Sequence, residues 1–351
     1  SKPFGELERR SWEWKRPMTR AALTSMVLSR SYIITASPDD RARIEREIGA
    51  RREVRCDARR GRRERARRGA ERIRALVIPP AWTDVWICAD ESGHIQATGV
   101  DEAGRTQYLY HPDWARRRDR GKFARALRLA AALPAARARV TTSLRRDGLD
   151  RERVLAAAFR MLDTVAPRVG SERYFARHGS RGLATLLRRD AAVDGNTVTF
   201  RFPGKSGAAQ ALSVVDVDLA AIVAELAVGR GRSPLLAYRT GRRRVALSTR
   251  EINDYVRSVT GGRFTAKDFR TLRGTILAAE ALAQIGPQED PADRTRAIVL
   301  AVKATAAGLG NTPAVARGSY IDPHVLRRYR DGEVLDTSIS AESAIRDLLG
   351  A

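Results

Sequence analysis

The sequence predicts an α+β protein in which a small antiparallel β-sheet precedes a mainly α-helical region that contains its own short β-hairpin or sheet. Three observations predict this class. Short alternating segments separated by turn residues lie between 85 and 110, helical periodicity begins near 113, and turn motifs interrupt the helical pattern between 190 and 215. A chain of 351 residues, 43% of them hydrophobic, is long enough for two domains with a sizeable core.

The first 70 residues predict a basic arm with little regular structure. Between Arg41 and Ala75 there are fifteen arginines and six acidic residues, with few apolar residues in a regular period. We expect residues 1–70 to be a flexible or loosely packed arm that can touch phosphates, or an extension without a role. After the arm we expect two domains. Residues 71–117 form a β-rich domain, to which parts of the arm can also belong, and residues 118–351 form a mainly helical domain.

The β-rich domain is predicted from three short strands at 85–88, 94–98 and 105–110, bounded by Asp-Glu-Ser-Gly and Asp-Glu-Ala-Gly turns. On the last strand, alternation places Tyr108 and Tyr110 on one face and Gln107 on the other. These side chains are either half-buried parts of the sheet or contacts to a ligand.

The helical domain begins with periodic segments from Asp113 to about Ala176, which we expect to break at Pro134 and at Asp147-Gly148. Residues 190–215 then read as strand, turn, strand, turn, strand, with Lys205 at the tip of a hairpin. After Asp216 we expect helices almost to the end of the chain.

Two later helices carry distinctive residues. One is capped by Thr265 and contains Lys267 and Arg270 three residues apart. Another spans about 293–307 and stops at glycines, after which Thr312-Pro313 forms the N-cap and first position of a helix that bears Tyr320.

The charge predicts a polyanionic partner. Lysine and arginine total 65 against 41 acidic residues, a formal net charge of +24, which points most simply to nucleic acid. No apolar run approaches the length of a membrane span, so we expect no membrane partner. Only six of the 65 cations are lysines, and a lysine, unlike an arginine, can give up a proton.

Four dispersed segments form one constellation: PRVGSERY, FPGKSG, KDFRT and GNTPAVARGSY. In residue type, order and spacing they resemble the catalytic core of type IB DNA topoisomerases, in the compact poxvirus-like and bacterial branch. The segments VIPPAWTDVWIC, HIQATG and GRTQYLYHPDW resemble the amino-terminal DNA-clamping sheet of that family, so the resemblance covers the chain from about residue 71 to its end. The positions that match the family's catalytic residues are Arg168, Lys205, Lys267, Arg270, Asn311 and Tyr320.

The resemblance implies that Tyr320 attacks a phosphodiester as the nucleophile. The transition state places extra negative charge on the nonbridging oxygens, and the planar guanidiniums of Arg168 and Arg270 suit that charge. Lys205 is implied as the general acid that protonates the departing 5′-oxygen, with Lys267 in support. A phenol has a pKa of about 10, so a positive surrounding must help it lose its proton.

Asn311 is a mild departure from the wider superfamily, in which histidine is usual nine residues before the tyrosine. An amide cannot act as a general acid or base, but it can donate a hydrogen bond, so we expect Asn311 to be an oxyanion donor. Asparagine at this place is known in the bacterial branch.

The resemblance also implies the partners. It predicts two domains that close as a C-shaped clamp on duplex DNA, with the strand of Gln107, Tyr108 and Tyr110 entering the major groove. It implies relaxation of supercoiled DNA without ATP, metal ion or small-molecule cofactor. We expect a monomer, since such a clamp needs no partner subunit. The two cysteines, Cys56 and Cys88, have no metal-ligand spacing and suggest a reducing compartment, so we expect the protein in the cytoplasm at the nucleoid.

The sequence leaves two alternatives open. A tyrosine site-specific recombinase shares the covalent chemistry, but recombinases generally have His-x-x-Arg where this chain has Lys267-Asp-Phe-Arg270, and their first domain is helical. A catalytically silent nucleoid-binding protein would bind DNA without forming any covalent adduct.

Overall fold

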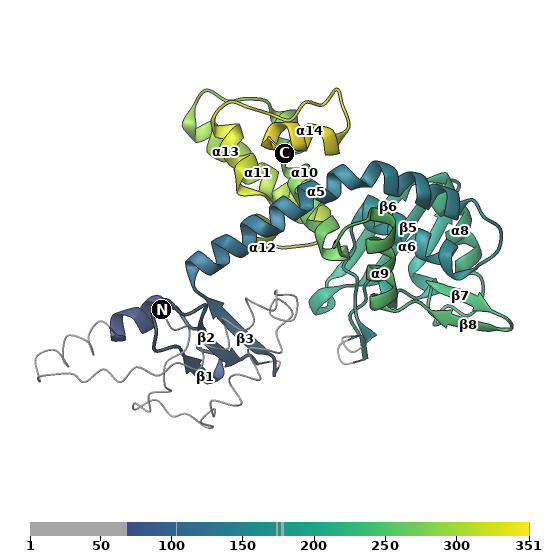
Figure 1. Cartoon of the computed structure of the whole chain (residues 1–351), viewed down its shortest axis with the longest axis horizontal. Coiled ribbons are helices and arrows are strands. Elements are labelled where there is room, and N and C mark those ends of the chain that lie inside the picture. The colour runs from purple at the N-terminus through teal and green to yellow at the C-terminus, as the bar shows by residue number, and fades with distance from the viewer. Residues whose placement is uncertain (1–68, 103, 173–174, 177–178, 351) are drawn as a thin grey trace, which may run out of the picture. The chain divides into compact units, whose positions relative to one another are not determined.

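The computed structural model describes residues 69–102, 104–172, 175–176 and 179–350. The predicted basic arm therefore lies almost entirely outside the described residues. The chain divides into two compact units, residues 1–119 and 120–351. Both helices and small antiparallel sheets are present, which confirms the predicted α+β class (Figure 1). Closure of the two parts as a clamp stays a prediction.

The first unit contains the predicted three-stranded antiparallel sheet, in the order β1-β2-β3. Its strands are β1 (Thr83–Ile87), β2 (Ile95–Val100) and β3 (Thr106–Tyr110). Strand β2 is central and almost wholly buried. The side chain of Gln96 organises the turn that precedes β2, since its amide nitrogen donates to the carbonyls of Asp90, Glu91 and Gly93 at 2.7–3.1 Å.

The long helix α5 (Pro112–Leu144) corrects the predicted break at Pro134, because that proline lies inside one continuous helix. Proline removes a single N–H donor from the helical ladder. The apolar side chains of Leu129, Leu133 and Val140 on this helix are completely buried in the core and offset that loss. The predicted break at Asp147-Gly148 is confirmed, and α6 (Arg151–Val165) follows with Asp150 as its N-cap.

The predicted β interlude is confirmed as a three-stranded antiparallel sheet. Its strands are β4 (Ala191–Asp194), β5 (Thr197–Pro203) and β6 (Ala209–Val215), and a short 3₁₀ turn, Lys205–Gly207, joins the last two. A second hairpin was not predicted, so the expectation of helices alone after Asp216 was wrong. Strands β7 (Ala237–Thr240) and β8 (Arg243–Ala246) pair through a turn in which Gly241 has φ +56°.

The remaining helices are capped by the residue types that favour helix starts. Thr265 and Asp268 form a capping box at the start of the predicted helix, and Gly310 ends the next one in the left-handed region with φ +58°. The helices are α8 (Val217–Ala227), α9 (Thr249–Thr260), α10 (Ala266–Ile285), α11 (Pro291–Leu309), α12 (Pro313–Ser319), α13 (Pro323–Arg330) and α14 (Ala341–Leu349).

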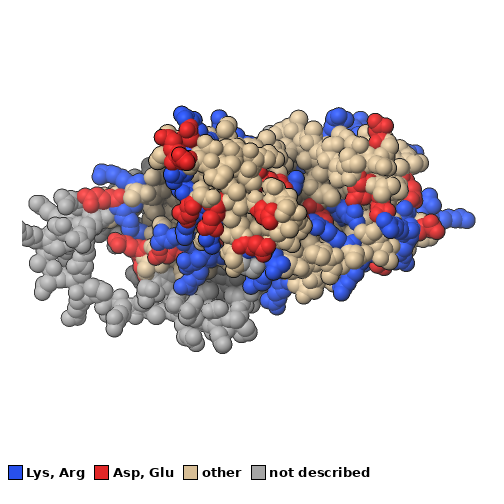
Figure 2. All heavy atoms as spheres, turned by 90° about the horizontal axis from the view of Figure 1, so that it is seen from above, with Lys and Arg blue, Asp and Glu red and all other residues tan. Residues whose placement is uncertain are grey.

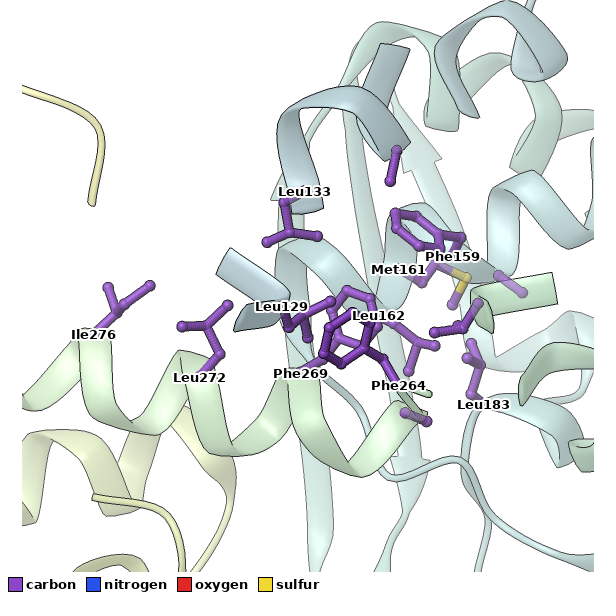
Figure 3. Packing of buried hydrophobic residues seen from close by; sticks show 14 of the residues in the cluster. Leu129, Leu133, Phe159, Met161, Leu162, Leu183, Phe264, Phe269, Leu272 and Ile276 are labelled. Carbon is purple, nitrogen blue, oxygen red and sulfur yellow. The ribbon is translucent and has the colours of Figure 1, made fainter. Parts of the chain in front are cut away.

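The core of the second unit forms where α5, α6 and α10 meet (Figure 3). Phe159 on α6 and Phe269 on α10 pack edge to face with ring centroids 5.3 Å apart. Leu129 and Leu133 of α5 pack into the same cluster. This packing anchors the first half of α10, the segment that contains Arg270.

Positive and negative side chains are mixed on the face shown in Figure 2. Several arginines of the second unit pair with nearly buried carboxylates, as Arg137 does with Asp163 at 2.7 Å and Arg181 with Asp190 at 2.8 Å. Within the described residues, no single helix is long and apolar enough to span a membrane, and one pair bent by 94°, α11 with α12, passes that test by length and composition only.

Candidate active site

Tyr320 is the first residue after helix α12, because that helix ends at Ser319. The sequence pattern predicted the tyrosine on the helix itself. Its backbone N–H still donates to the carbonyl of Ala316 at 3.0 Å, which closes the last helical turn. The side chain is half-buried, so the phenol is held by the protein and retains access to solvent.

Helix α10 approaches the backbone of Tyr320 very closely at two residues that sequence analysis did not single out. A methyl group on Gly274 would lie 2.8 Å from Cβ of Tyr320 and 2.9 Å from its carbonyl oxygen, too close for any side chain. The next residue, Thr275, is buried, and its hydroxyl lies 3.1 Å from the carbonyl oxygen of Tyr320 and accepts from the N–H of Asp322 at 3.2 Å. These contacts fix the segment that carries the tyrosine.

Arg270 lies beside the tyrosine, with its guanidinium carbon 5.1 Å from the centroid of the Tyr320 ring. The arginine is 5% exposed and is held from behind by two backbone carbonyls, Ala166 at 2.6 Å and Leu309 at 2.8 Å. Ala166 has φ +42°, a left-handed conformation that is costly for alanine. Ala166 is the residue that ends helix α6, and in this conformation its carbonyl oxygen accepts a hydrogen bond from Arg270.

Arg168 and Asn311 are in direct contact, as one nitrogen of the guanidinium donates to Oδ1 of the amide. A second nitrogen lies 3.4 Å from the carbonyl oxygen of Gly310. An arginine has only donors, so the amide must turn its oxygen toward Arg168 and its nitrogen away. The backbone N–H of Asn311 donates to the carbonyl of Ala306 at 2.8 Å, which ties this residue to the end of α11.

Two buried donors at this site have no hydrogen-bond partner among the described residues. They are Nδ2 of Asn311 and Nε of Arg270. Such unpaired donors are rare in native proteins and call for an explanation. Arg270 contacts the ring of Tyr320, and Asn311 is bonded to Arg168, whose charge acts on the same tyrosine.

The pKa of Tyr320 lies below the ordinary value of a phenol. Burial raises this pKa, but the charge of Arg270, a hydrogen bond from its guanidinium, and the charges of Arg168 and Lys267 together lower it by more. Burial lowers the pKa of Arg270, and the tyrosine opposes that effect. The site therefore stabilises the phenolate more than water stabilises that of a free tyrosine, and the phenolate is the form that acts as a nucleophile.

The two lysines occupy different positions. Lys267 is exposed on the first turn of α10, and its charge acts on Tyr320. Lys205 is exposed at the tip of the β5–β6 hairpin, as its turn motif predicts. No hydrogen bond, ion pair or ring contact among the described residues joins Lys205 to Arg168, Asn311 or Tyr320. Of the six predicted residues, the second unit thus brings four together: Arg168, Arg270, Asn311 and Tyr320. Lys267 acts on the tyrosine through its charge, and Lys205 lies apart from these residues at the tip of the hairpin.

A surface pocket extends from the two arginines to that hairpin. Its lining includes Arg168, Arg270, Gly204 and Gln210. The pocket therefore connects the guanidiniums with the base of the turn that carries Lys205.

The three residues predicted to read DNA all lie on β3 in the first unit. Tyr108 and Tyr110 share a face, as alternation predicts, with ring centroids 6.2 Å apart, and Arg118 lies 5.1 Å from the Tyr110 centroid. The amide nitrogen of Gln107 donates to Asp101 at 2.8 Å. Gln107 must therefore exchange this bond before its nitrogen can contact a base.

A half-buried phenol with a lowered pKa, two guanidiniums and a free amide donor form a set suited to transfer at phosphorus. In a transfer of this kind a phenol would supply the nucleophile, and fixed cations would stabilise the negative charge that grows on the phosphate oxygens.

Comparison with known proteins agrees with this chemistry. The family model of the eukaryotic DNA topoisomerase I catalytic core matches residues 111–335, which is more than half of the chain. The model of the bacterial DNA topoisomerase IB N-terminal domain matches residues 57–101. The DNA topoisomerase 1B of Acanthamoeba polyphaga mimivirus is 29% identical over 272 residues, which cover 74% of this chain and 80% of the relative. These matches favour the topoisomerase interpretation over the recombinase and the silent DNA-binding protein, and the chain belongs to the type IB DNA topoisomerase family.

Proposed function

We propose that this topoisomerase relaxes supercoiled duplex DNA by cutting one strand reversibly through a covalent 3′-phosphotyrosyl bond to Tyr320, without ATP or a metal ion. The observation that carries the proposal is the placement of the Arg270 guanidinium 5.1 Å from the ring of Tyr320, next to buried donors that lack a partner. A tyrosine that only packs in the core does not require a buried cation and unpaired donors beside it, whereas a tyrosine that attacks a phosphate requires both.

In the cleavage step, Tyr320 loses its phenolic proton to solvent, its phenolate oxygen forms a bond to phosphorus, and the bond from phosphorus to the 5′-oxygen breaks. Arg168 and Arg270 donate to the nonbridging oxygens, and Nδ2 of Asn311 supplies a further donor. The proton that the departing 5′-oxygen needs comes from Lys205, because its ammonium can release one and a guanidinium cannot.

The covalent bond conserves the energy of the phosphodiester, so resealing is the same step in reverse. Between the two steps the free 5′ end rotates and releases supercoils of either sign. Lys267 supports the nucleophile by keeping positive charge near the phenol, in line with its effect on the pKa of Tyr320.

The β3 strand of the first unit contributes binding to the duplex through Tyr108, Tyr110 and Gln107. A protein with a net charge of +24 that contacts many phosphates binds DNA with an affinity that falls steeply as salt rises. We propose that the enzyme acts as a monomer on the cytoplasmic nucleoid.

The test is relaxation of negatively and positively supercoiled plasmid in EDTA and without ATP, with the native chain and Tyr320→Phe. Native protein should relax both substrates, and Tyr320→Phe should relax neither while still binding plasmid. Tyr329→Phe is the matched control, because that tyrosine is 1% exposed and its hydroxyl donates to the carbonyl of Gly286. Full relaxation by Tyr320→Phe, or a covalent adduct that persists in it, would refute the assignment of the nucleophile.

A further inference from the structure

Gln210 lies on strand β6, opposite Phe202 of β5, five residues after Lys205. Its side chain is half-buried and lines the pocket that also contains Arg168 and Arg270. The catalytic steps proposed above leave this amide without a role.

On one side, Gln210 lies against the base of the lysine hairpin. A methyl group added to Gly204 would sit 2.6 Å from Cγ of Gln210 and 3.2 Å from its Cδ. A larger residue at this position would displace the glutamine side chain from its present place. Gly204 is the residue immediately before Lys205.

On its other side, the same side chain lies against the end of α11. A methyl group on Gly310 would overlap Oε1 of Gln210 and lie 2.9 Å from both Cδ and Nε2. Gly310 is the residue immediately before Asn311, and Arg168 reaches its carbonyl oxygen at 3.4 Å. Gln210 therefore fills the space between the residue that precedes Lys205 and the residue that precedes Asn311.

Among the described residues, no backbone hydrogen bond ties the tip of the hairpin to another segment. The backbone hydrogen bonds of residues 204–208 within the described structure stay inside the turn, as from Gly204 to Ala208 at 2.7 Å. At the base of the hairpin, the N–H of Arg181 donates to Pro203 at 2.8 Å. The side chain of Gln210 links the hairpin to the segment that carries Asn311 by packing against Gly310, while its amide nitrogen donates to the neighbouring carbonyl of Ala209 at 3.2 Å.

We propose that Gln210 is a positioning residue that holds the Lys205 hairpin against the Gly310–Asn311 segment, so that the lysine ammonium meets the departing 5′-oxygen. This inference rests on the proposed function, in which Lys205 is the general acid. Gln210 itself touches neither the phosphate nor the reacting oxygens.

A role of Gln210 through Lys205 can be recognised by comparing substrates that do and do not need a proton from the lysine. During cleavage the bond from phosphorus to O5′ breaks and the ammonium of Lys205 transfers its proton to that oxygen. If sulfur replaces the bridging 5′-oxygen, the bond from phosphorus to sulfur breaks instead and a thiolate leaves without a proton. A defect that acts through the general acid should therefore appear on the oxygen substrate and vanish on the sulfur substrate.

The experiment measures single-turnover formation of the covalent adduct on two duplexes that differ only in this bridging atom. We expect Gln210→Ala to slow cleavage of the oxygen duplex about 10-fold, since small misplacements of a catalytic group are costly. Cleavage of the sulfur duplex should stay within about twofold of the native rate, because no proton transfer is needed. Gln210→Asn, which keeps the amide on a shorter side chain, should give a smaller defect with the same pattern.

Two controls separate the possible failures. Ser213→Ala changes an exposed residue on the opposite face of β6 and should cleave both duplexes at the native rate. Lys205→Ala should be slow on oxygen and restored by sulfur. If sulfur does not restore Lys205→Ala, the general-acid assignment fails and this inference fails with it.

Other outcomes concern Gln210 alone. If Lys205→Ala is restored by sulfur while Gln210→Ala is equally slow on both duplexes, Gln210 has a merely structural role and the inference is overturned. It is also overturned if Gln210→Ala cleaves the oxygen duplex at the native rate. Thermal denaturation of each variant identifies a loss of rate that comes from unfolding.

Discussion

The hydroxyl of Thr275 holds the backbone segment that carries Tyr320, and a single substitution can remove it. It is 1% exposed, accepts from the N–H of Asp322 at 3.2 Å, and lies 3.1 Å from the carbonyl oxygen of Tyr320 and 3.0 Å from that of Thr271. Thr275→Val keeps the shape of the side chain and removes the hydroxyl. We expect the substitution to loosen the segment that carries the nucleophile and to lower stability.

The magnitude follows from the contacts. The buried N–H of Asp322 loses its acceptor, and an unsatisfied buried donor costs roughly 1–3 kcal/mol. For a unit the size of residues 120–351, that loss lowers Tm by about 2–12 °C. The freed turn also misplaces the phenol, so we expect cleavage to slow about 10-fold.

Thermal denaturation and single-turnover cleavage measure the two effects, with Thr275→Ser as the matched control because it keeps the hydroxyl. Serine should retain most of the native stability and rate. Equal behaviour of valine and serine variants in both assays would refute the reasoning, since only the hydroxyl distinguishes their hydrogen bonds.

Two further predictions concern the same site. Gly274→Ala places a methyl group 2.8 Å from Cβ of Tyr320, so we expect this overpacking to lower the free energy of unfolding by about 1–3 kcal/mol and to slow cleavage. Gly121→Ala is the control, since that glycine has open space around it and alanine there should be neutral or slightly stabilising. Equal effects of the two substitutions in thermal denaturation would contradict this account. Burial raises the pKa of Tyr320, but the charges of Arg270 and, to a smaller extent, Lys267 hold it below its ordinary value. Lys267→Gln should therefore raise this pKa and shift the rise of the cleavage rate with pH to higher pH, and an unchanged pH–rate profile would show that the ammonium does not act on the phenol.

Much of the fold could be predicted because local signals agree with the final structure. The turns around β1, β2 and β3, the Gly-Lys-Ser-Gly hairpin and the caps at Thr265 and Thr312 all act through neighbouring residues. Pro134 shows where local signals fail, because burial of the surrounding apolar side chains outweighs one lost hydrogen bond. The β7–β8 hairpin was missed because four arginines at its turn mask the alternation that marks a strand.

The catalytic candidates were found from residue types and their order along the chain, which a family resemblance makes visible. The residues that surround these candidates in the structure were not found from the sequence. Ala166, Gly274 and Thr275 carry no chemical signal in sequence, and each matters only because distant segments meet there. Gln210 is similar, since its link to Gly310 spans a hundred residues of chain.

The sequence by itself determined which candidate catalytic groups the chain carries: two lysines, two arginines, an amide in place of an imidazole, and a tyrosine. Residue type sets chemical capacity, and turn and cap motifs act over a few residues. Only the tertiary structure decided that Arg270 faces the phenol, that Asn311 turns its nitrogen away from Arg168, and that the tyrosine backbone is fixed by α10. These relations depend on packing between α6, α10, α11 and α12, and packing is a property of the whole folded unit.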